Sequence, residues 1–136
     1  MVTLKEMIMK NTILILILFL SLYSCRNSYE LSMERGEYFY NAGAYEEATL
    51  EYKSVINHYP SDLRVLDEKT IHMLANAHHN LAVIFLKRST KTDDKIKKLS
   101  FLYQAISEAK QSYELYPKDA YKETWDSIQS ILNTIQ

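Results

Sequence analysis

Two segments of this 136-residue chain end in the same kind of four-residue pattern: Tyr59-Pro60-Ser61-Asp62 and Tyr116-Pro117-Lys118-Asp119. Proline cannot continue a helix interior, because its ring removes the backbone N–H and clashes with the preceding turn. Aspartate, two residues later, can accept hydrogen bonds from the first free amides of a following helix. Each pattern therefore predicts a boundary at which one helix ends and another begins.

The composition favours helices throughout the chain. It contains only two Gly and two Pro, and 47% of its residues are hydrophobic. A length of 136 residues suits one modest domain. The net charge of -1 gives no sign of a nucleic-acid partner, and a single cysteine excludes an internal disulfide. We therefore expect one all-α domain.

Apolar residues recur at helical spacing in several segments of the chain. Asn27, with Glu30 three residues later, predicts a capping box at the start of the first helix. Asp62 is the expected N-cap of a long third helix and Asp93 that of the fourth, with a charged loop over residues 87–98 between them. The last helix has one apolar and one polar face, which is typical of a helix that closes a helical array. The expected helices span residues 28–41, 45–58, 62–87, 94–116 and 120–135.

The first two expected helices carry a more specific pattern. Reading backwards from Pro60, small and aromatic residues stand at fixed intervals: Tyr52, Ala48, Tyr45, Gly43, Phe39 and Gly36. This order and spacing resembles the tetratricopeptide (TPR) repeat, a helix–turn–helix unit of about 34 residues. The resemblance implies a short antiparallel helical solenoid that acts as a binding scaffold. Its parts would be repeat one at residues 29–62, an enlarged repeat two at residues 63–119, and a capping helix at residues 120–136.

In TPR proteins the first helix of each repeat lines a concave face that binds a partner segment. By matching positions, the resemblance places two rows of residues on this face: Glu30, Met33, Glu37, Tyr40 and Asn41 in repeat one, and Asn76, His79, Asn80, Val83 and Lys87 in repeat two. Some TPR domains clamp a terminal carboxylate with Lys and Asn. Met33 and Glu37 stand in the first-repeat positions here, so we expect an amphipathic or basic segment instead. For any one of these residues, packing against the last helix or the repeat extension is the alternative.

The start of the chain resembles a bacterial lipoprotein signal peptide. Lys5 and Lys10 precede a short apolar run at residues 13–22, and Leu22-Tyr23-Ser24-Cys25 follows it. A charged start, a short apolar core and a small residue before the cut describe a secretory signal. The Leu-x-Ser-Cys ending is similar to a lipobox. The resemblance implies that residues 1–24 are removed, whether translation starts at Met1, Met7 or Met9.

This resemblance also implies a location for the protein. Cys25 would become the lipidated first residue of the mature chain, and residues 25–28 would form a short tether that keeps the domain close to the membrane. Arg26, where Asp would favour the inner membrane, favours the outer membrane of the bacterial envelope, facing the periplasm. An uncleaved membrane anchor is the alternative, although its apolar core is about half of the ~20 residues that span a bilayer.

The sequence contains no constellation that points to catalysis or metal binding. Zinc-binding helices place two histidines four residues apart, whereas His72 and His79 are seven apart and His78 is adjacent to His79. The acidic pair Glu46-Glu47 fits the dipole of a helix start. We therefore expect no enzyme activity, no cofactor and no metal.

The expected function is that of a lipid-anchored adaptor whose protein–protein contacts help to assemble or stabilise a cell-envelope complex. With so few repeats, the solenoid could be completed by its partner or by a second copy of itself. The alternative is an accessory binding protein for a small apolar ligand delivered to a transporter. In that alternative, aromatic side chains would line a cavity: Phe85, Tyr103, Tyr113 and Trp125.

Overall fold

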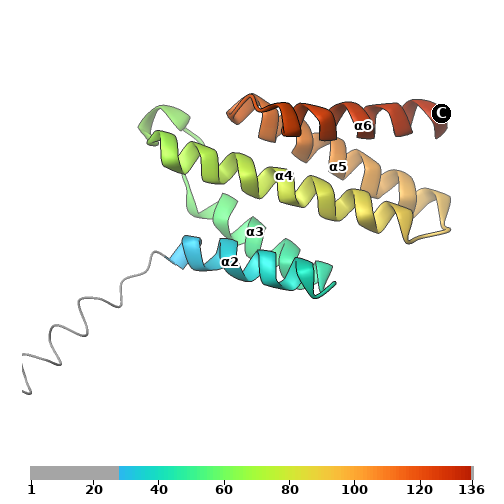
Figure 1. Ribbon diagram of the computed structural model, residues 1–136, viewed down its shortest axis with the longest axis horizontal. Coiled ribbons are helices and arrows are strands. Elements are labelled where there is room, and N and C mark those ends of the chain that lie inside the picture. The colour runs from blue at the N-terminus through green and yellow to red at the C-terminus, as the bar shows by residue number, and fades with distance from the viewer. Residues whose placement is uncertain (1–27, 136) are drawn as a thin grey trace, which may run out of the picture.

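The computed structural model describes residues 28–135, and this part of the chain is all-helical. The helices α2, α4 and α6 run in the same direction, and α3 and α5 return between them (Figure 1). This repeat-like arrangement confirms the predicted fold class. The elements are α2 (Ser28–Asn41), α3 (Tyr45–His58), the 3-10 turn η1 (Leu63–Val65), α4 (Glu68–Thr90), α5 (Lys95–Leu115) and α6 (Asp119–Ile135). The expected signal peptide, Cys25 and the Asn27 cap lie outside the described residues.

The helices α2 and α3 begin and end at the predicted residues, because a glycine turn separates them. Gly43 has a φ of 76°, a left-handed conformation that glycine adopts without steric cost. Its amide donates to the carbonyl of Tyr40 at 3.0 Å, and the amide of Ala44 donates to the carbonyl of Phe39 at 2.9 Å. These two bonds satisfy the last carbonyls of α2 in the manner of a Schellman motif.

The long third helix begins later than predicted. Asp62 caps only η1, where its carboxylate accepts from the amide of Arg64 at 3.1 Å. Asp67 is the N-cap of α4, and it accepts from the amide of Thr70 at 2.7 Å. Both aspartates precede residues that can form helix, so the capping rule alone does not distinguish them.

The connection between α4 and α5 is shorter than the predicted loop. The helix α4 continues to Thr90, and its last turn buries Ser89, whose hydroxyl donates to the carbonyl of Leu86 at 2.7 Å. Asp94, not Asp93, is the N-cap of α5, because its carboxylate accepts from two amides of the first turn at 2.9 and 3.1 Å. The charged segment therefore lies mostly within helices.

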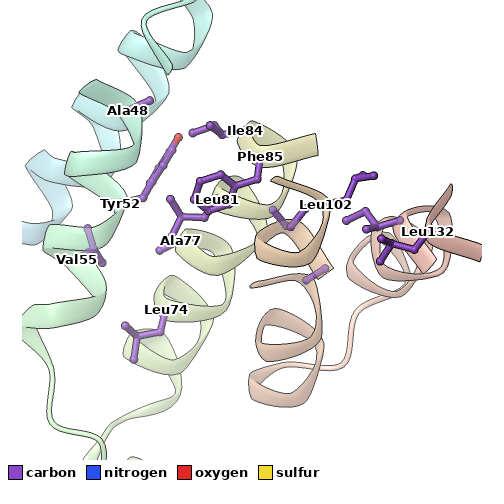
Figure 2. Packing of buried hydrophobic residues seen from close by; sticks show 14 residues of the cluster. Ala48, Tyr52, Val55, Leu74, Ala77, Leu81, Ile84, Phe85, Leu102 and Leu132 are labelled. Carbon is purple, nitrogen blue, oxygen red and sulfur yellow. The ribbon is translucent and has the colours of Figure 1, made fainter. Parts of the chain in front are cut away.

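One hydrophobic core runs through the described helices, with α4 at its centre. The helix α4 packs against α3, α5 and α6. Side chains of α3 point toward α4 across the interface in Figure 2, and alanines at several facing positions let the helices approach closely. The buried core includes Ala48, Tyr52 and Val55 of α3, Ala77, Leu81 and Ile84 of α4, Leu102 and Ala105 of α5, and Ile128 and Leu132 of α6.

The helix α2 packs on α3 through a close contact between Gly36 and Tyr52. A Cβ atom added at Gly36 would lie 2.7 Å from Cε1 and 2.8 Å from Cζ of the Tyr52 ring. Tyr52 is only 2% exposed and belongs to the same buried cluster as the facing side chains of α4. The ring therefore cannot move aside without disturbing the core.

We predict that Gly36→Ala lowers the free energy of unfolding. Overpacking against the Tyr52 ring costs about 1–3 kcal/mol, which outweighs the gain of about 1 kcal/mol in helix propensity. Urea unfolding followed by circular dichroism measures the difference, with Ser54→Ala on the exposed face of α3 as the control. A Gly36→Ala variant as stable as that control would contradict the close contact.

Candidate functional site

The predicted α4 residues, apart from His79, lie on the outward face of that helix. Asn76 and Lys87 are exposed, and Asn80 and Val83 are half-buried. Their spacings of four, three and four residues place them on one face, since residues three or four apart stand one above the other on a helix. The other side of α4 packs into the core. This face is therefore available to a partner in the described part of the chain.

The predicted α2 residues form a second row beside it. Glu37 and Asn41 are exposed, and Glu30, Met33 and Tyr40 are half-buried. Met33 and Tyr40 also pack against the edge of the core. The row thus combines an apolar platform with acidic and amide groups. We refer to the surface formed by the α2 and α4 rows as the α2–α4 seam.

The two rows meet at the hydroxyl of Tyr52, which comes from α3. Asn80 forms a side-chain hydrogen bond with this hydroxyl, and Glu37 and Tyr40 lie close enough to act on it electrostatically. Burial above all, and then the charge of Glu37, raises the pKa of Tyr52 to about 12, against the opposing effect of the Asn80 hydrogen bond. Predicted residues of both α2 and α4 therefore lie near one polar group.

An ion pair joins the two helices at the start of the seam. Lys69 Nζ in the first turn of α4 lies 2.6 Å from Glu30 Oε1 of α2. The lysine side chain is 80% exposed, so the pair adds little stability. A small hollow of about 100 Å³ lies beside it, lined by Glu30, Lys69, Tyr29, Asp67, Thr70 and Met73. Lys69 thus compensates the charge of Glu30, and Glu37 is the exposed acidic residue of the seam.

Aromatic rings and a lysine lie near the other end of the seam. The rings of Tyr40 and Tyr45 are 5.7 Å apart. Lys91 Nζ lies 4.5 Å from the centre of the Tyr45 ring, which is a cation–π contact between α3 and the end of α4. Lys87 is exposed one turn earlier on α4. This end of the seam therefore has cationic character, whereas Glu37 makes its middle acidic.

Among the predicted α4 residues, His79 differs because its side chain packs against α6. Its ring lies 4.7 Å from that of Tyr121 in α6. Burial, with a smaller effect from Lys118, lowers the pKa of His79. His72, two turns earlier, packs in the same way, with its ring 3.6 Å from that of Tyr116. The capping helix and the turn before it thus cover this edge of α4, as the packing alternative expected.

Sequence reasoning missed two members of the seam, Tyr52 and Lys69. The helical spacing of Tyr52 identifies it as an inward-facing residue of α3, but periodicity does not say which groups its hydroxyl contacts. Lys69 lies in a segment that the sequence suggested was an extension before the second repeat. Both contacts link residues far apart in the chain, so only the packing of the α2–α3 hairpin against α4 reveals them.

The aromatic residues proposed for a ligand cavity do not line one together. Phe85 is 3% exposed within the core, and Tyr103 is 51% exposed on α5. The rings of Tyr113 and Trp125 are 5.9 Å apart and pack α5 against α6. These side chains hold helices together or face solvent.

Within residues 28–135, no three His, Cys, Asp or Glu side chains are placed to hold a metal ion. None of the helices in this range is long and apolar enough to cross a membrane. Comparisons of the chain with protein-family models, with curated proteins and with solved structures gave no match.

We predict that Tyr52→Phe changes how stability depends on alkaline pH. Because folding raises the pKa of Tyr52 from 10.0 to about 12, its contribution is present below pH 10 and is lost as the pH rises toward 12. The variant lacks this ionisation. It also lacks the hydrogen bond to Asn80, which costs about 1 kcal/mol at neutral pH.

The free energy of unfolding in urea, measured at pH 8 and at several values between pH 10 and 12, tests this effect of Tyr52 ionisation. Over that alkaline range the wild type should lose about 2 kcal/mol more than Tyr52→Phe. The control is Tyr38→Phe, because Tyr38 is 69% exposed, and its curve should follow the wild type. Equal alkaline losses in the wild type and Tyr52→Phe would contradict the placement of this hydroxyl.

Proposed function

We propose that this protein is a TPR-like adaptor, anchored by a lipid on Cys25, that holds a segment of an envelope protein along the α2–α4 seam. The observation that carries the proposal is the convergence of Glu37, Tyr40 and Asn80 around the Tyr52 hydroxyl. Groups from two successive repeat-like units meet there. A segment laid across the seam would therefore contact both units at once.

The side chains of the seam suit a peptide. Asn76 and Asn80 stand one turn apart on α4, and each amide offers donors and an acceptor that can bond a peptide backbone. Met33 and Tyr40 offer half-buried apolar surface beside them. A flexible thioether and an aromatic ring adapt to different apolar side chains. This combination favours recognition of an amphipathic segment.

The charges of the seam favour a basic residue in that segment. Glu37 is exposed in the middle of the α2 row, whereas Glu30 is already paired with Lys69. A lysine or arginine of the partner would meet Glu37 while its apolar neighbours meet Met33 and Tyr40. Asn41 and the exposed Lys87 lie toward the far end of their rows, where Lys87 favours an acidic or polar residue of the segment.

The lipid anchor rests on the Leu-Tyr-Ser-Cys sequence that ends at Cys25. The helix α2 begins at Ser28, so the tether from Cys25 spans no more than about 10 Å. Glu30, which opens the seam, stands in the first turn of α2. In the proposed arrangement the seam starts beside the membrane, and its partner is a membrane-proximal segment.

A second copy of the chain is a possible further partner of this adaptor. The helix α6 covers one end of the helical array, and α2 stands at the other end of the described residues. There Leu31 is 39% exposed and Tyr38 is 69% exposed, two turns apart on one face. Such an apolar pair suits contact with another copy of the chain.

We predict that replacing Met33 and Tyr40 together by Ala releases the partner. The change removes the apolar platform of the seam, so the amount of partner recovered should fall at least about tenfold, as for the loss of a binding hot spot. In-cell crosslinking, affinity purification of the full chain and mass spectrometry measure the recovery. Circular dichroism checks that the variant keeps its helices.

The matched control replaces Leu31 and Tyr38 together by Ala. This pair has the same spacing on the same helix but lies on another face of α2. It should leave recovery of the main partner within about twofold. Undiminished recovery with the Met33 and Tyr40 double variant would rule out the seam as the binding site.

We also predict that Cys25→Ala abolishes lipidation. Metabolic labelling with an alkyne-bearing fatty acid in a bacterial host should mark the wild type and leave the variant unmarked, because Cys25 is the single cysteine of the chain and its thiol is the expected lipidation site. Ser24→Ala keeps a small residue before Cys25 and serves as the control. Equal labelling of Cys25→Ala and the wild type would refute the anchor without affecting the seam.

A further inference from the structure

A larger hollow lies on the other side of α4 from the seam. It has a volume of about 530 Å³ and opens to solvent between the end of α3, the connection to α4 and the end of α5. Its apolar walls include Ile56, Leu63, Leu74 and Leu115. We call this hollow the α3–α5 groove.

The groove arises from the way in which α3 ends. Pro60 stops the helix, and the chain then forms only η1 before α4 begins at Glu68. The helices α3 and α5 both pack on α4, but they are not packed tightly against each other. Between their ends, α4 forms the floor and the irregular connection forms one wall. The enlarged second unit thus encloses space that a compact helix pair would fill.

A buried polar pair stands at the floor of the groove. His78 lines the groove and is only 7% exposed, and its Nδ1 lies 2.6 Å from Oε2 of Glu108 in α5. A carboxylate accepts hydrogen bonds, so Nδ1 is the donor in this contact. The second ring nitrogen, Nε2, is then the one left to interact with a molecule in the groove. The lining also contains the polar residues Asn57, Ser61 and Gln111, and a concave site with apolar walls and a few polar groups is the usual form of a small-molecule site.

The charges around the groove disfavour an anion. Glu114 lines it, and Glu108 stands behind His78. Lys110 lies 3.6 Å from Glu114, and water screens both charges because the two side chains are 56% and 59% exposed. At the buried end, an anionic head group would approach the carboxylate of Glu108, whose side chain is only 19% exposed. A neutral or cationic head that donates a hydrogen bond avoids this repulsion.

We propose that the α3–α5 groove binds a small apolar molecule that carries a hydroxyl or an amino group. The apolar body lies against Leu74, Ile56 and Leu115, and the head donates a hydrogen bond to Nε2 of His78. The volume falls within the range of small-molecule pockets. This site is separate from the α2–α4 seam, so the protein can hold a ligand and a partner segment at once.

Three probes that share one ring system test the ligand class: naphthylmethanol, naphthylmethylamine and naphthoate. They are titrated into the ¹⁵N-labelled full chain bearing Cys25→Ala, in detergent micelles of one fixed composition, so that partition of each probe is the same for every variant. Backbone amide shifts report where each probe binds and how tightly. Ligands of this size are expected to bind with dissociation constants of about 1 mM.

We expect naphthylmethanol and naphthylmethylamine to change the NMR chemical shifts of the backbone amides of Leu74, His78 and Leu115. We expect naphthoate to bind at least about fivefold more weakly, because its charge would approach Glu108 and its carboxylate cannot donate a hydrogen bond to Nε2 of His78. Whichever of the first two binds more tightly identifies the head group. Naphthoate binding equal to theirs, no shifts at all, or shifts confined to Asn76 and Asn80 of the seam would each overturn the proposal.

Two matched variants test the location. Leu63→Asp puts a charge on an apolar wall of the groove, whereas Val65→Asp puts the same charge on the same 3-10 turn but outside the lining. Both side chains are already exposed, at 43% and 68%, so neither change threatens folding. Leu63→Asp should weaken naphthylmethanol binding at least about fivefold and Val65→Asp less than about twofold. Equal effects of the two variants would overturn the site.

Discussion

The contact between Gly36 and the Tyr52 ring sets the geometry of the first helical hairpin and, through it, of the candidate binding face. Because no Cβ fits at Gly36, α2 approaches α3 closely enough for the Tyr52 ring to lie between them. The ring is buried, and its hydroxyl hydrogen-bonds with Asn80 of α4. One side chain thus fixes three helices relative to one another. Glu37 and Asn80, which belong to different repeat-like units, face a common point for this reason.

The helix α4 contributes to two surfaces because it lies between α3 on one side and α5 on the other. Asn76 and Asn80 face the seam, whereas Leu74 and His78 face the groove. Residues two positions apart on a helix point in nearly opposite directions, so one short stretch can contribute to both. Buried alanine and leucine side chains of α4 lie in the core between the two surfaces and separate them. Each surface can therefore be altered without direct contact with the other.

The sequence predicts those features that depend on local chemistry. The bounds of α2 and α3 follow from Gly43 and Pro60, since a left-handed turn and a proline leave few alternatives. The start of α4 was predicted wrongly because Asp62 and Asp67 are both competent caps, and only packing selects the second. The two rows of the seam were predicted from the resemblance to the TPR repeat, and that resemblance did not reveal the contact of His79 with Tyr121 of α6. The pairing of His78 with Glu108 joins residues thirty positions apart, and no local pattern encodes it.

The interface between the α2–α3 hairpin and the rest of the described chain determines which part of the fold opens first. The hairpin of α2 and α3 joins the rest of the described chain through the interface of α3 with α4, whereas α4, α5 and α6 share a more extensive packing. Local opening is easiest where the fewest apolar contacts must break, so the hairpin is the unit that detaches first. The α2–α4 seam crosses this joint. A molecule bound across the seam recognises only the closed form, and by mass action it holds the hairpin in place. If the proposed partner segment occupies the seam, it would reduce how often protease-sensitive backbone is exposed, and the lifetime of the protein would depend on the presence of that partner.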